Sequence, residues 1–480
     1  FKQKTAYEML RSLVGSEMCI RDSYMSLRRA FSIALSAVGM LYVTRVVGPE
    51  NYGLFASVVG VYTFMTQIVG MGIRLYLVRC EDEHLAENAH QAFWWLVGFG
   101  SVLVVAALGG TGTLGRLWIT EAQFLPVAVA VWTGLPLFAA TMVSQALLER
   151  ALRYRRMAAI DISAQIASYA VGIPLALGGY GVWALVCSFW AATLTTCTAS
   201  YLSSRYVPRW SWSRGRLREM LQYAFAQAIS EWLYYAKNLM PALVLLPLAG
   251  KEAVGYFALA ERLLNLLNFA QASIRGVTTT VLARVQKEPA KMLHVLYISP
   301  QAQILSLGGV SLLFVLGAWY LLPPLFGAEW DIRLAVLTLA LLVFEQLLTA
   351  TFSTQAQALY VIRQPHVVTK AALLFVVNFC WLTALLTYLA PKGYAVVGYG
   401  LANFLAHLPN NVFLHRGVAR YIGKPRYGMN LVWAIALGVA LFAPIASYAP
   451  LLALGVFLLP ASRRALRELT QEIRALRTQS

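Results

Sequence analysis

The chain consists of long apolar runs separated by short polar connections, and this pattern predicts its secondary structure. A helix needs about 20 mostly apolar residues to cross the hydrocarbon core of a membrane. About fourteen such runs occur in the 480 residues, and no alternating apolar–polar stretch is long enough for a membrane-spanning strand. Because a backbone in lipid must satisfy its own hydrogen bonds, the pattern predicts an all-α polytopic membrane protein. The runs are 27–47, 54–78, 90–110, 122–148, 158–178, 181–203, 218–248, 253–280, 295–322, 332–360, 366–389, 394–414, 430–447 and 450–461.

Composition supports a membrane protein over a soluble one. Hydrophobic residues make up 59% of the chain and charged residues 12%, whereas a soluble protein has about 25% charged residues. Too few charged groups are present to cover a surface that faces water. The net charge of +18 would suggest nucleic acid as the partner of a soluble protein. In a membrane protein an excess of Lys and Arg is typical of cytoplasmic loops, so no nucleic-acid partner is expected.

The positions of the basic residues predict the orientation. The connections that follow odd-numbered runs contain only Arg116, Lys251 and Lys392. The connections on the other side contain many more, including the clusters Arg153–Arg156 and Arg214–Arg218. The excess keeps its sign at every turn. We therefore expect an even number of spans, with both termini in the cytoplasm.

Two short motifs recur at an offset of about two hundred residues. Gly48-Pro-Glu-Asn-Tyr-Gly-Leu-Phe-Ala56 shares the frame G-x-E-x-x-G-x-F-A with Gly250-Lys-Glu-Ala-Val-Gly-Tyr-Phe-Ala258. Gly179-Tyr-Gly-Val-Trp183 corresponds in the same way to Gly393-Tyr-Ala-Val-Val397. Both pairs connect runs whose numbers differ by six: the first pair follows runs 1 and 7, and the second lies at the start of runs 6 and 12. This predicts two parallel six-helix repeats, each beginning with a tight outer turn, followed by two additional C-terminal helices.

These features divide the chain into six predicted parts. The first is a polar segment without the pattern of a signal peptide, which we expect to be non-native or disordered. The last spaces apolar residues at three- and four-residue steps among Arg and Glu, as an amphipathic helix at the cytoplasmic surface does. The parts are the segment 1–23, an N-terminal six-helix lobe at 24–205, a cytoplasmic linker at 206–217, a C-terminal six-helix lobe at 218–416, two further transmembrane helices at 430–461 and the tail 462–480.

Five motifs in order along the chain resemble a known family, the polysaccharide-type lipid-linked oligosaccharide flippases of the multidrug/oligosaccharidyl-lipid/polysaccharide exporter superfamily. The resemblance covers residues 27 to about 416, and the motifs are Arg45–Ala56, Gly70–Arg74, Leu177–Leu185, Val254–Arg262 and Leu325–Trp330. It implies two lobes around a central cavity and transport by alternating access. The implied substrate is an undecaprenyl-pyrophosphate-linked oligosaccharide, moved to the outer leaflet of the bacterial plasma (inner) membrane for O-antigen, capsule or exopolysaccharide synthesis. Glycan polymerases and glycosyltransferases of the same pathway are the implied protein partners.

Basic residues inside the predicted spans are candidates for the substrate site. Ionisable residues are costly in a membrane and usually face a cavity, and arginine can grip a pyrophosphate with two parallel hydrogen bonds. Alternative roles remain for two of the candidates, since Arg275 has the reach to snorkel to the cytoplasmic surface and Arg45 has the position to anchor the outer interface. The predicted cationic cavity residues are Arg74, Lys237, Arg262 and Arg275, with Arg45 near the outer mouth.

Uncharged polar residues and one acid complete the candidate site. Asn265, Asn268 and Gln271 follow Arg262 at three-residue steps and share one broad helix face. That face has two interpretations, contact with sugar hydroxyls or hydrogen bonding between helices. Glu345 is the most isolated acid within a span and the candidate for coupling to H⁺ or Na⁺. No other cofactor and no metal ion is expected.

Missing motifs exclude several activities. The sequence has neither a phosphate-binding Walker loop nor an H-E-x-x-H pair, so transport driven by ATP is not expected from this chain. It also lacks the large outer loop with which a membrane glycan polymerase or ligase usually works, so an enzyme is the least favoured alternative. A multidrug or cation antiporter of the same superfamily should have an acidic cavity, whereas the deep charges here lean basic. A lipid II flippase remains an alternative with a similar mechanism.

Overall fold

The computed structural model describes residues 39, 42–70, 72–80, 82–115, 118–326, 329–391, 393–443 and 445–479. The predicted segment 1–23 and most of the first apolar run, 27–47, lie outside these residues. Within them the regular structure is entirely helical. The predicted all-α architecture is therefore confirmed.

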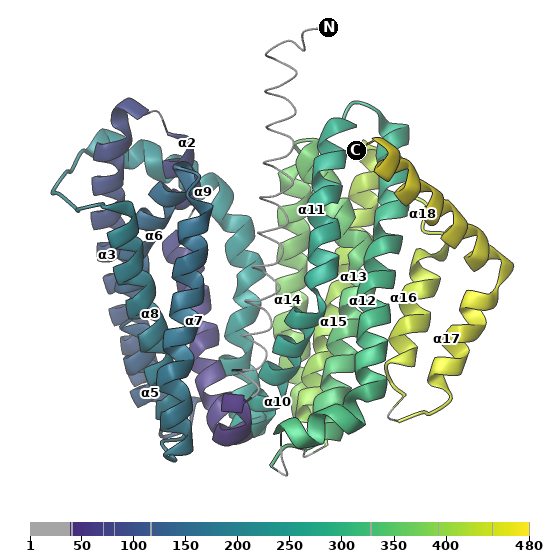
Figure 1. The fold of residues 1–480 in the computed structure, drawn as a ribbon, viewed down its shortest axis with the longest axis horizontal. Helices are drawn as coiled ribbons and strands as arrows, with labels where there is room; N and C mark the ends of the chain where they lie inside the picture. Colours follow the sequence, from purple (N-terminus) through teal and green to yellow (C-terminus); the bar gives the residue numbers. More distant parts are fainter. Residues whose placement is uncertain are drawn as a thin grey trace, which may run out of the picture.

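Residues 42–70 form a first helix, which has no label in Figure 1, and sixteen labelled helices follow it. They are α2 (Ile73–Arg79), α3 (Leu85–Gly110), α5 (Phe124–Trp132), α6 (Leu135–Arg150), α7 (Tyr154–Leu177), α8 (Val182–Ser204), α9 (Arg214–Tyr235), α10 (Leu246–Leu267), α11 (Phe269–Arg284), α12 (Pro289–Phe326), α13 (Ile332–Val361), α14 (Pro365–Leu389), α15 (Ala395–Tyr421), α16 (Met429–Ala440), α17 (Ala449–Leu458) and α18 (Pro460–Gln479). Short 3₁₀ and π turns, η1 (Asp82–His84), η2 (Thr111–Gly115), η3 (Ala236–Leu239) and η4 (Pro241–Leu245), join some of them.

Nine helical segments of the described chain are long and apolar enough to cross a membrane, or ten if the bent pair α17 and α18 counts as one span. This number of segments is lower than the fourteen predicted runs, partly because some continuous segments contain more than one predicted run. Trp232–Leu267, for example, includes parts of the predicted runs 218–248 and 253–280. The polytopic character is confirmed, and the number of fourteen stays a prediction.

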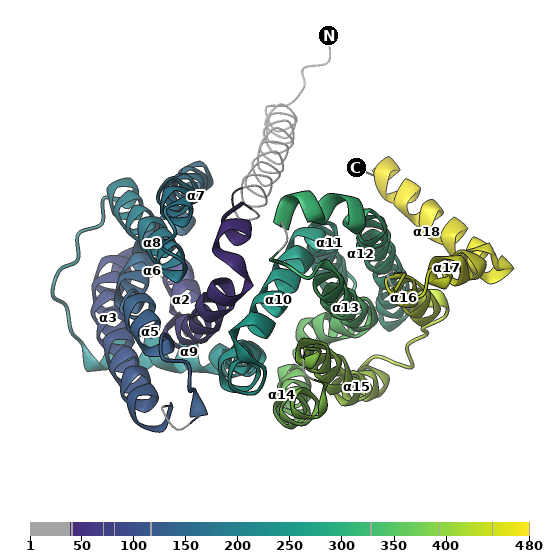
Figure 2. The same cartoon turned by 90° about the horizontal axis from the view of Figure 1, so that it is seen from below.

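The helices form two groups, α2 to α8 on one side and α10 to α18 on the other (Figure 1). Seen from below, the helix of residues 42–70 and α10 lie next to each other between the groups (Figure 2). Helix α9 connects the groups, because it contacts α2 and α3 as well as α14. At the far edge of the second group, α18 turns by 71° away from α17.

Corresponding glycines in the two repeats have the same unusual backbone. Gly48 has φ 77° and Gly250 has φ 83°, in the left-handed region that glycine adopts without strain. Each breaks a helix at the turn that the shared motif predicts. Gly179 and Gly393, the glycines of the second motif pair, also match, with φ 79° and 90°. The glycines of both motif pairs thus share a backbone conformation, and the two parallel six-helix repeats stay a prediction.

The connection between the groups is tied to the end of α3. The Tyr206 hydroxyl donates to the backbone oxygen of Ala89 at 3.2 Å, and Trp94 Nε1 donates to the Arg209 oxygen at 3.1 Å. Burial raises the pKa of the Tyr206 phenol, so this hydroxyl stays a donor at neutral pH. These bonds hold the chain in place where it leaves one group and enters the other.

Candidate functional site

The turns that begin the two repeats pack directly against each other. We name residues 48–53 and 250–255 together the latch. A Cβ atom placed on Gly53 would lie 1.8 Å from the backbone oxygen of Lys251, and one placed on Gly255 would lie 2.2 Å from that of Pro49. Only glycine, which lacks a Cβ atom, lets each turn come this close to the backbone of the other. Lys251 Nζ adds an ion pair with Glu50 Oε2 at 3.1 Å.

Aromatic residues close the space around the latch. The indole of Trp330 packs edge-on against Tyr52 and Tyr256, with ring centroids 6.3 and 5.4 Å away. The Tyr256 hydroxyl accepts a hydrogen bond of 2.7 Å from the Asp331 backbone nitrogen. Arg45 lies at this end as well, where Nη1 donates to the Pro324 oxygen at 2.9 Å. The two helix groups therefore meet tightly at one end of the molecule.

A cavity of about 420 Å³ lies between the groups and begins directly behind the latch. Its walls come from the helix of residues 42–70 and from α9, η3, α10, α11, α13, α14 and α15. Aromatic and small apolar residues line the end near the latch, and charged and amide side chains line the rest. The polar lining residues are Tyr52, Thr63, Tyr234, Lys237, Asn238, Glu261, Arg262, Asn265, Asn268, Arg275, Glu345, Gln346, Tyr399 and Asn403.

Three of the described lining residues are cations, and all three are among the predicted site residues. Arg262 and Arg275 lie on α10 and α11, separated by roughly 20 Å of helix at about 1.5 Å per residue. Lys237 lies on η3, with Nζ 3.4 Å from the Tyr234 hydroxyl and 4.6 Å from the centre of its ring. The cations are therefore distributed along the cavity and not gathered at one point.

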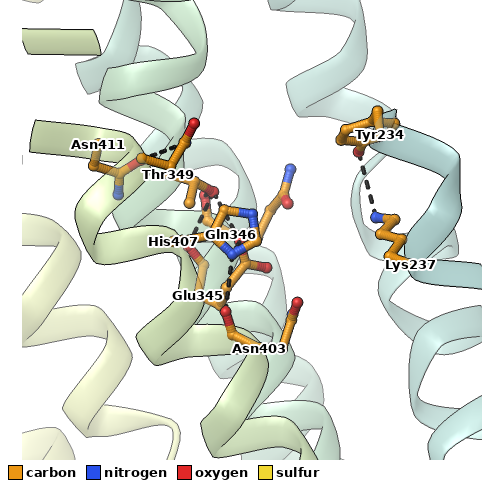
Figure 3. Close-up of polar contacts among 9 residues, drawn as sticks. Tyr234, Lys237, Glu345, Gln346, Thr349, Asn403, His407 and Asn411 are labelled. Carbon is orange, nitrogen blue, oxygen red and sulfur yellow. Dashed lines mark hydrogen bonds and ion pairs between the residues drawn. The ribbon is translucent and has the colours of Figure 1, made fainter. Parts of the chain in front are cut away.

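Two carboxylates, Glu261 and Glu345, line the same cavity and interact electrostatically with Lys237. Glu345 Oε1 lies 3.3 Å from His407 Nδ1, and the Thr349 hydroxyl donates to Oε1 at 3.3 Å. Figure 3 shows Glu345 and His407 on one wall, with Tyr234 and Lys237 on the wall opposite. With the His407 imidazole neutral, the described lining residues include three positive and two negative side chains.

A smaller cavity of about 190 Å³ continues from the first along α13 and α15. It shares Lys237, Arg275 and Glu345 with the larger cavity and adds His407 and Ser353. Its further residues lie toward the end of α13 that is remote from the latch. The polar surface therefore runs from the latch toward the other face of the protein.

The remaining predicted residues take other positions. Gln271 is fully buried, and its Oε1 accepts from Gln346 Nε2 at 3.3 Å, which is the interhelical role left open by the sequence. Arg74 is absent from the cavity lining, since its Nε donates to Glu149 Oε2 at 2.7 Å. Arg74 lies in helix α2, which begins after Gly72, where φ is 76°. The substrate roles of these residues stay predictions.

The sequence interpretation missed His407 and Tyr234. Both lie within predicted spans, in the runs 394–414 and 218–248, and the test for ionisable residues inside a span would have selected His407. Its proximity to Glu345 was not visible, because 62 positions separate them along the chain. Among the described residues, no group of three or more His, Cys, Asp or Glu side chains has the arrangement of a metal site.

Solved structures with a similar fold are membrane transporters. The lipid II flippase MurJ in an inward closed conformation has a TM-score of 0.69 at 13% identity, covering 93% of this chain and 99% of that chain. An inward-facing multidrug resistance transporter of the MATE family, in the MOP superfamily, has a TM-score of 0.62 at 15% identity, covering 81% and 95%. At such identities the likeness shows the fold alone. The chain has the fold of the transporter superfamily that its motifs predicted.

Sequence comparison identifies the family within this class. Residues 42–335, more than half of the chain, match the family described as polysaccharide biosynthesis protein, and the chain belongs to that family. It is also similar to the succinoglycan biosynthesis transport protein ExoT of Rhizobium meliloti (strain 1021), with 24% identity over 319 residues, or 65% of this chain. The match spans 63% of the length of that protein.

Proposed function

We propose that this protein flips an undecaprenyl-pyrophosphate-linked oligosaccharide from the cytoplasmic to the outer leaflet of the bacterial plasma membrane. It works by alternating access and supplies the synthesis of O-antigen, capsule or exopolysaccharide. The observation that carries the proposal is the cavity between the two helix groups, with Lys237, Arg262 and Arg275 on its walls. A pyrophosphate carries negative charge that these cations offset, and Arg adds paired hydrogen bonds. The family and the name of the relative from Rhizobium meliloti agree with this role.

The arrangement of the latch supports the direction of transport. The basic residues predict that the latch faces the outside and that both termini are cytoplasmic. With the latch closed, the headgroup enters from the cytoplasmic side, while the lipid chain stays in the membrane. The latch then opens as the cytoplasmic ends of the two groups approach each other, and the headgroup leaves on the outer side. We infer that the chain is a transporter and not a polymerase or ligase, and that those enzymes act on the glycan before or after it.

Reconstitution into liposomes tests the proposal directly. Purified protein is mixed with a fluorescent undecaprenyl-pyrophosphate glycan, and a membrane-impermeant reagent that destroys the fluorophore reports the leaflet. We expect the fraction protected from the reagent to fall when the protein is present. Parallel arms with lipid II and with a cationic dye test the two rival substrates. Transport of the dye without transport of either lipid would contradict the proposal and favour a cation antiporter, and preference for lipid II would favour a lipid II flippase.

A further inference from the structure

The pair formed by Glu345 and His407 has a geometry suited to holding a proton. His407 Nδ1 lies 2.9 Å from the backbone oxygen of Asn403, as well as 3.3 Å from Glu345 Oε1. A carbonyl oxygen only accepts hydrogen bonds, so Nδ1 carries a hydrogen. The other ring nitrogen, Nε2, is then the position at which His407 gains or loses its second proton. When it gains one, the imidazolium stands beside the Glu345 carboxylate.

Because the pair is largely buried, a net charge on it is energetically costly. The Glu345 side chain is 8% exposed and that of His407 is 17% exposed. The Phe375 ring packs against the imidazole with centroids 4.1 Å apart. A carboxylate in such surroundings is costly unless a positive charge offsets it. Two groups are placed to do so, His407 in direct contact and Lys237 on the facing wall (Figure 3).

The two partners differ in when they are charged. Lys237 has a high pKa as a residue type, whereas histidine changes its charge near neutral pH. When His407 is protonated, Glu345 is paired locally and Lys237 is free for an anion. When His407 is neutral, the carboxylate offsets Lys237 instead. The smaller cavity, which has room for several waters, gives His407 a polar route to the aqueous phase.

The other titratable groups around the pair come from the neighbouring elements. Helix α9 contributes Tyr234, α10 contributes Glu261 and Arg262, and α11 contributes Arg275. Helix α15 also contributes Tyr399, which lines the larger cavity about two turns before His407. Helices α12, α14 and α16 also pack on α13, and none of the described residues that they give to the two cavities is titratable. Among the described residues that line the two cavities, Glu261 is therefore the one other acid whose protonation has to be separated from that of the pair.

We propose that Glu345 and His407 form a proton-binding site whose occupancy strengthens binding of the anionic headgroup. The inference rests on the proposed function, because the anion is the pyrophosphate of the substrate. The direction of the effect on binding follows from charge, because a proton added to the cavity wall favours binding of an anion. Linkage is reciprocal, so headgroup binding must also take up protons. A sodium site fits less well, because Glu345 Oε1 is approached by an N–H and a hydroxyl donor.

Binding measurements at different pH values test this linkage. The probe is a short-chain prenyl pyrophosphate that carries one N-acetylglucosamine. Both of its phosphates are substituted, so its charge does not change near neutral pH. We expect its affinity for the purified protein to rise by up to about tenfold per pH unit as the pH falls through the range in which histidine titrates. Calorimetry in two buffers of different ionisation enthalpy should show protons taken up on binding.

Three variants assign the effect to the pair. His407→Gln and Glu345→Gln should each bind the probe with little dependence on pH, and Glu261→Gln should keep the dependence of the unmodified protein. His415→Gln is the matched control, because His415 lies on the same helix and contacts Tyr427 instead of the cavity. Thermal unfolding checks that each variant is folded. The number of protons taken up on binding is measured on the unmodified protein, so that result does not depend on whether the variants fold.

The outcomes separate this inference from the function on which it rests. Absence of probe binding at every pH would overturn both. Binding that is independent of pH, or that weakens as protons are added, would overturn the inference and leave the function standing. A pH dependence that persists in His407→Gln and disappears in Glu261→Gln would place the proton elsewhere. Binding of the probe that requires Na⁺ at constant pH would overturn the inference, because the linked ion would then be sodium and not a proton.

Discussion

Arg262 and Arg275 reach the same cavity from two consecutive helices, α10 and α11. Their separation along the helices suits a headgroup that moves through the cavity and meets one cation after another. Arg262, near Tyr52 and the latch, would hold the pyrophosphate at the deepest point. Arg275 would meet it earlier, in the region where the two cavities join. We therefore expect each arginine to contribute at a different stage of the proposed passage.

Removing the guanidinium of Arg262 should reduce flipping strongly. A hydrogen bond to a charged group contributes about 1.5–3 kcal/mol, so Arg262→Ala should lower the flipping rate by at least about tenfold at limiting substrate. Arg262→Lys keeps the charge but loses the paired hydrogen bonds, and an intermediate rate is expected. Arg333→Ala serves as control, since Arg333 is exposed at the start of α13 and lies outside the cavity lining. Equal rates for Arg262→Ala and the control would contradict this role.

Several site residues were predictable from the sequence because a single property marks them. Lys237, Arg262, Arg275 and Glu345 are charged residues inside apolar runs, and all four line the cavity. Arg74 has the same property, but its partner, Glu149, comes from a helix 75 positions away and was not visible in the chain. Burial cost identifies which residues need a partner, and only the fold shows whether that partner is a protein side chain or a cavity.

At the scale of elements, the latch depends on glycine more than on charge. The ion pair of Lys251 with Glu50 leaves 31% and 60% of the two side chains exposed, and exposed pairs contribute at most about 1 kcal/mol. The approach of Gly53 to Lys251 leaves no room for even one methyl group. The sequence predicted both turns from their shared frame. That the turns meet each other was not predictable, because it depends on how the repeats are arranged in space.

Gly53→Ala should therefore weaken closure of the latch. The added methyl group would overlap the Lys251 oxygen, so the two turns would have to separate. We would measure this as faster labelling of a cysteine at position 63, in the cavity, by a membrane-impermeant maleimide added from the latch side. Gly109→Ala is the matched control, because a Cβ at Gly109 in α3 meets no atom within 4 Å. Labelling as slow in Gly53→Ala as in the control would show that the latch tolerates the methyl group.

At the scale of the whole molecule, two helix groups meet at the latch, and a cavity lies behind it. Helix α9 links the groups by packing against both. Its Trp232 Nε1 donates to the Gln67 oxygen of the first helix at 3.1 Å, and the Arg79 guanidinium contacts the Tyr223 hydroxyl at 3.3 Å. Such an arrangement suits a rocking motion in which the groups separate at one end as they approach at the other.

A reversible crosslink across the latch tests whether transport requires that motion. Cysteines replace Glu50 and Lys251, whose charged atoms are 3.1 Å apart, in a protein whose native cysteines are changed to serine. A bifunctional maleimide with a cleavable disulfide then joins them. We expect flipping in liposomes to stop after crosslinking and to return after reduction. Undiminished flipping while the crosslink is intact would exclude opening of the latch as a step of transport.

The close fit of Gly53 and Gly255 also bears on the cell's energy supply. Behind the latch lies a cavity with many polar lining residues, a surface that water can wet. We therefore expect the contact between the two turns to provide much of the barrier to ions at this end of the cavity. A variant in which the two turns stay apart should conduct ions continuously, whether or not it transports a glycan. We therefore expect the tight glycine packing to help maintain the membrane potential on which the rest of the cell depends.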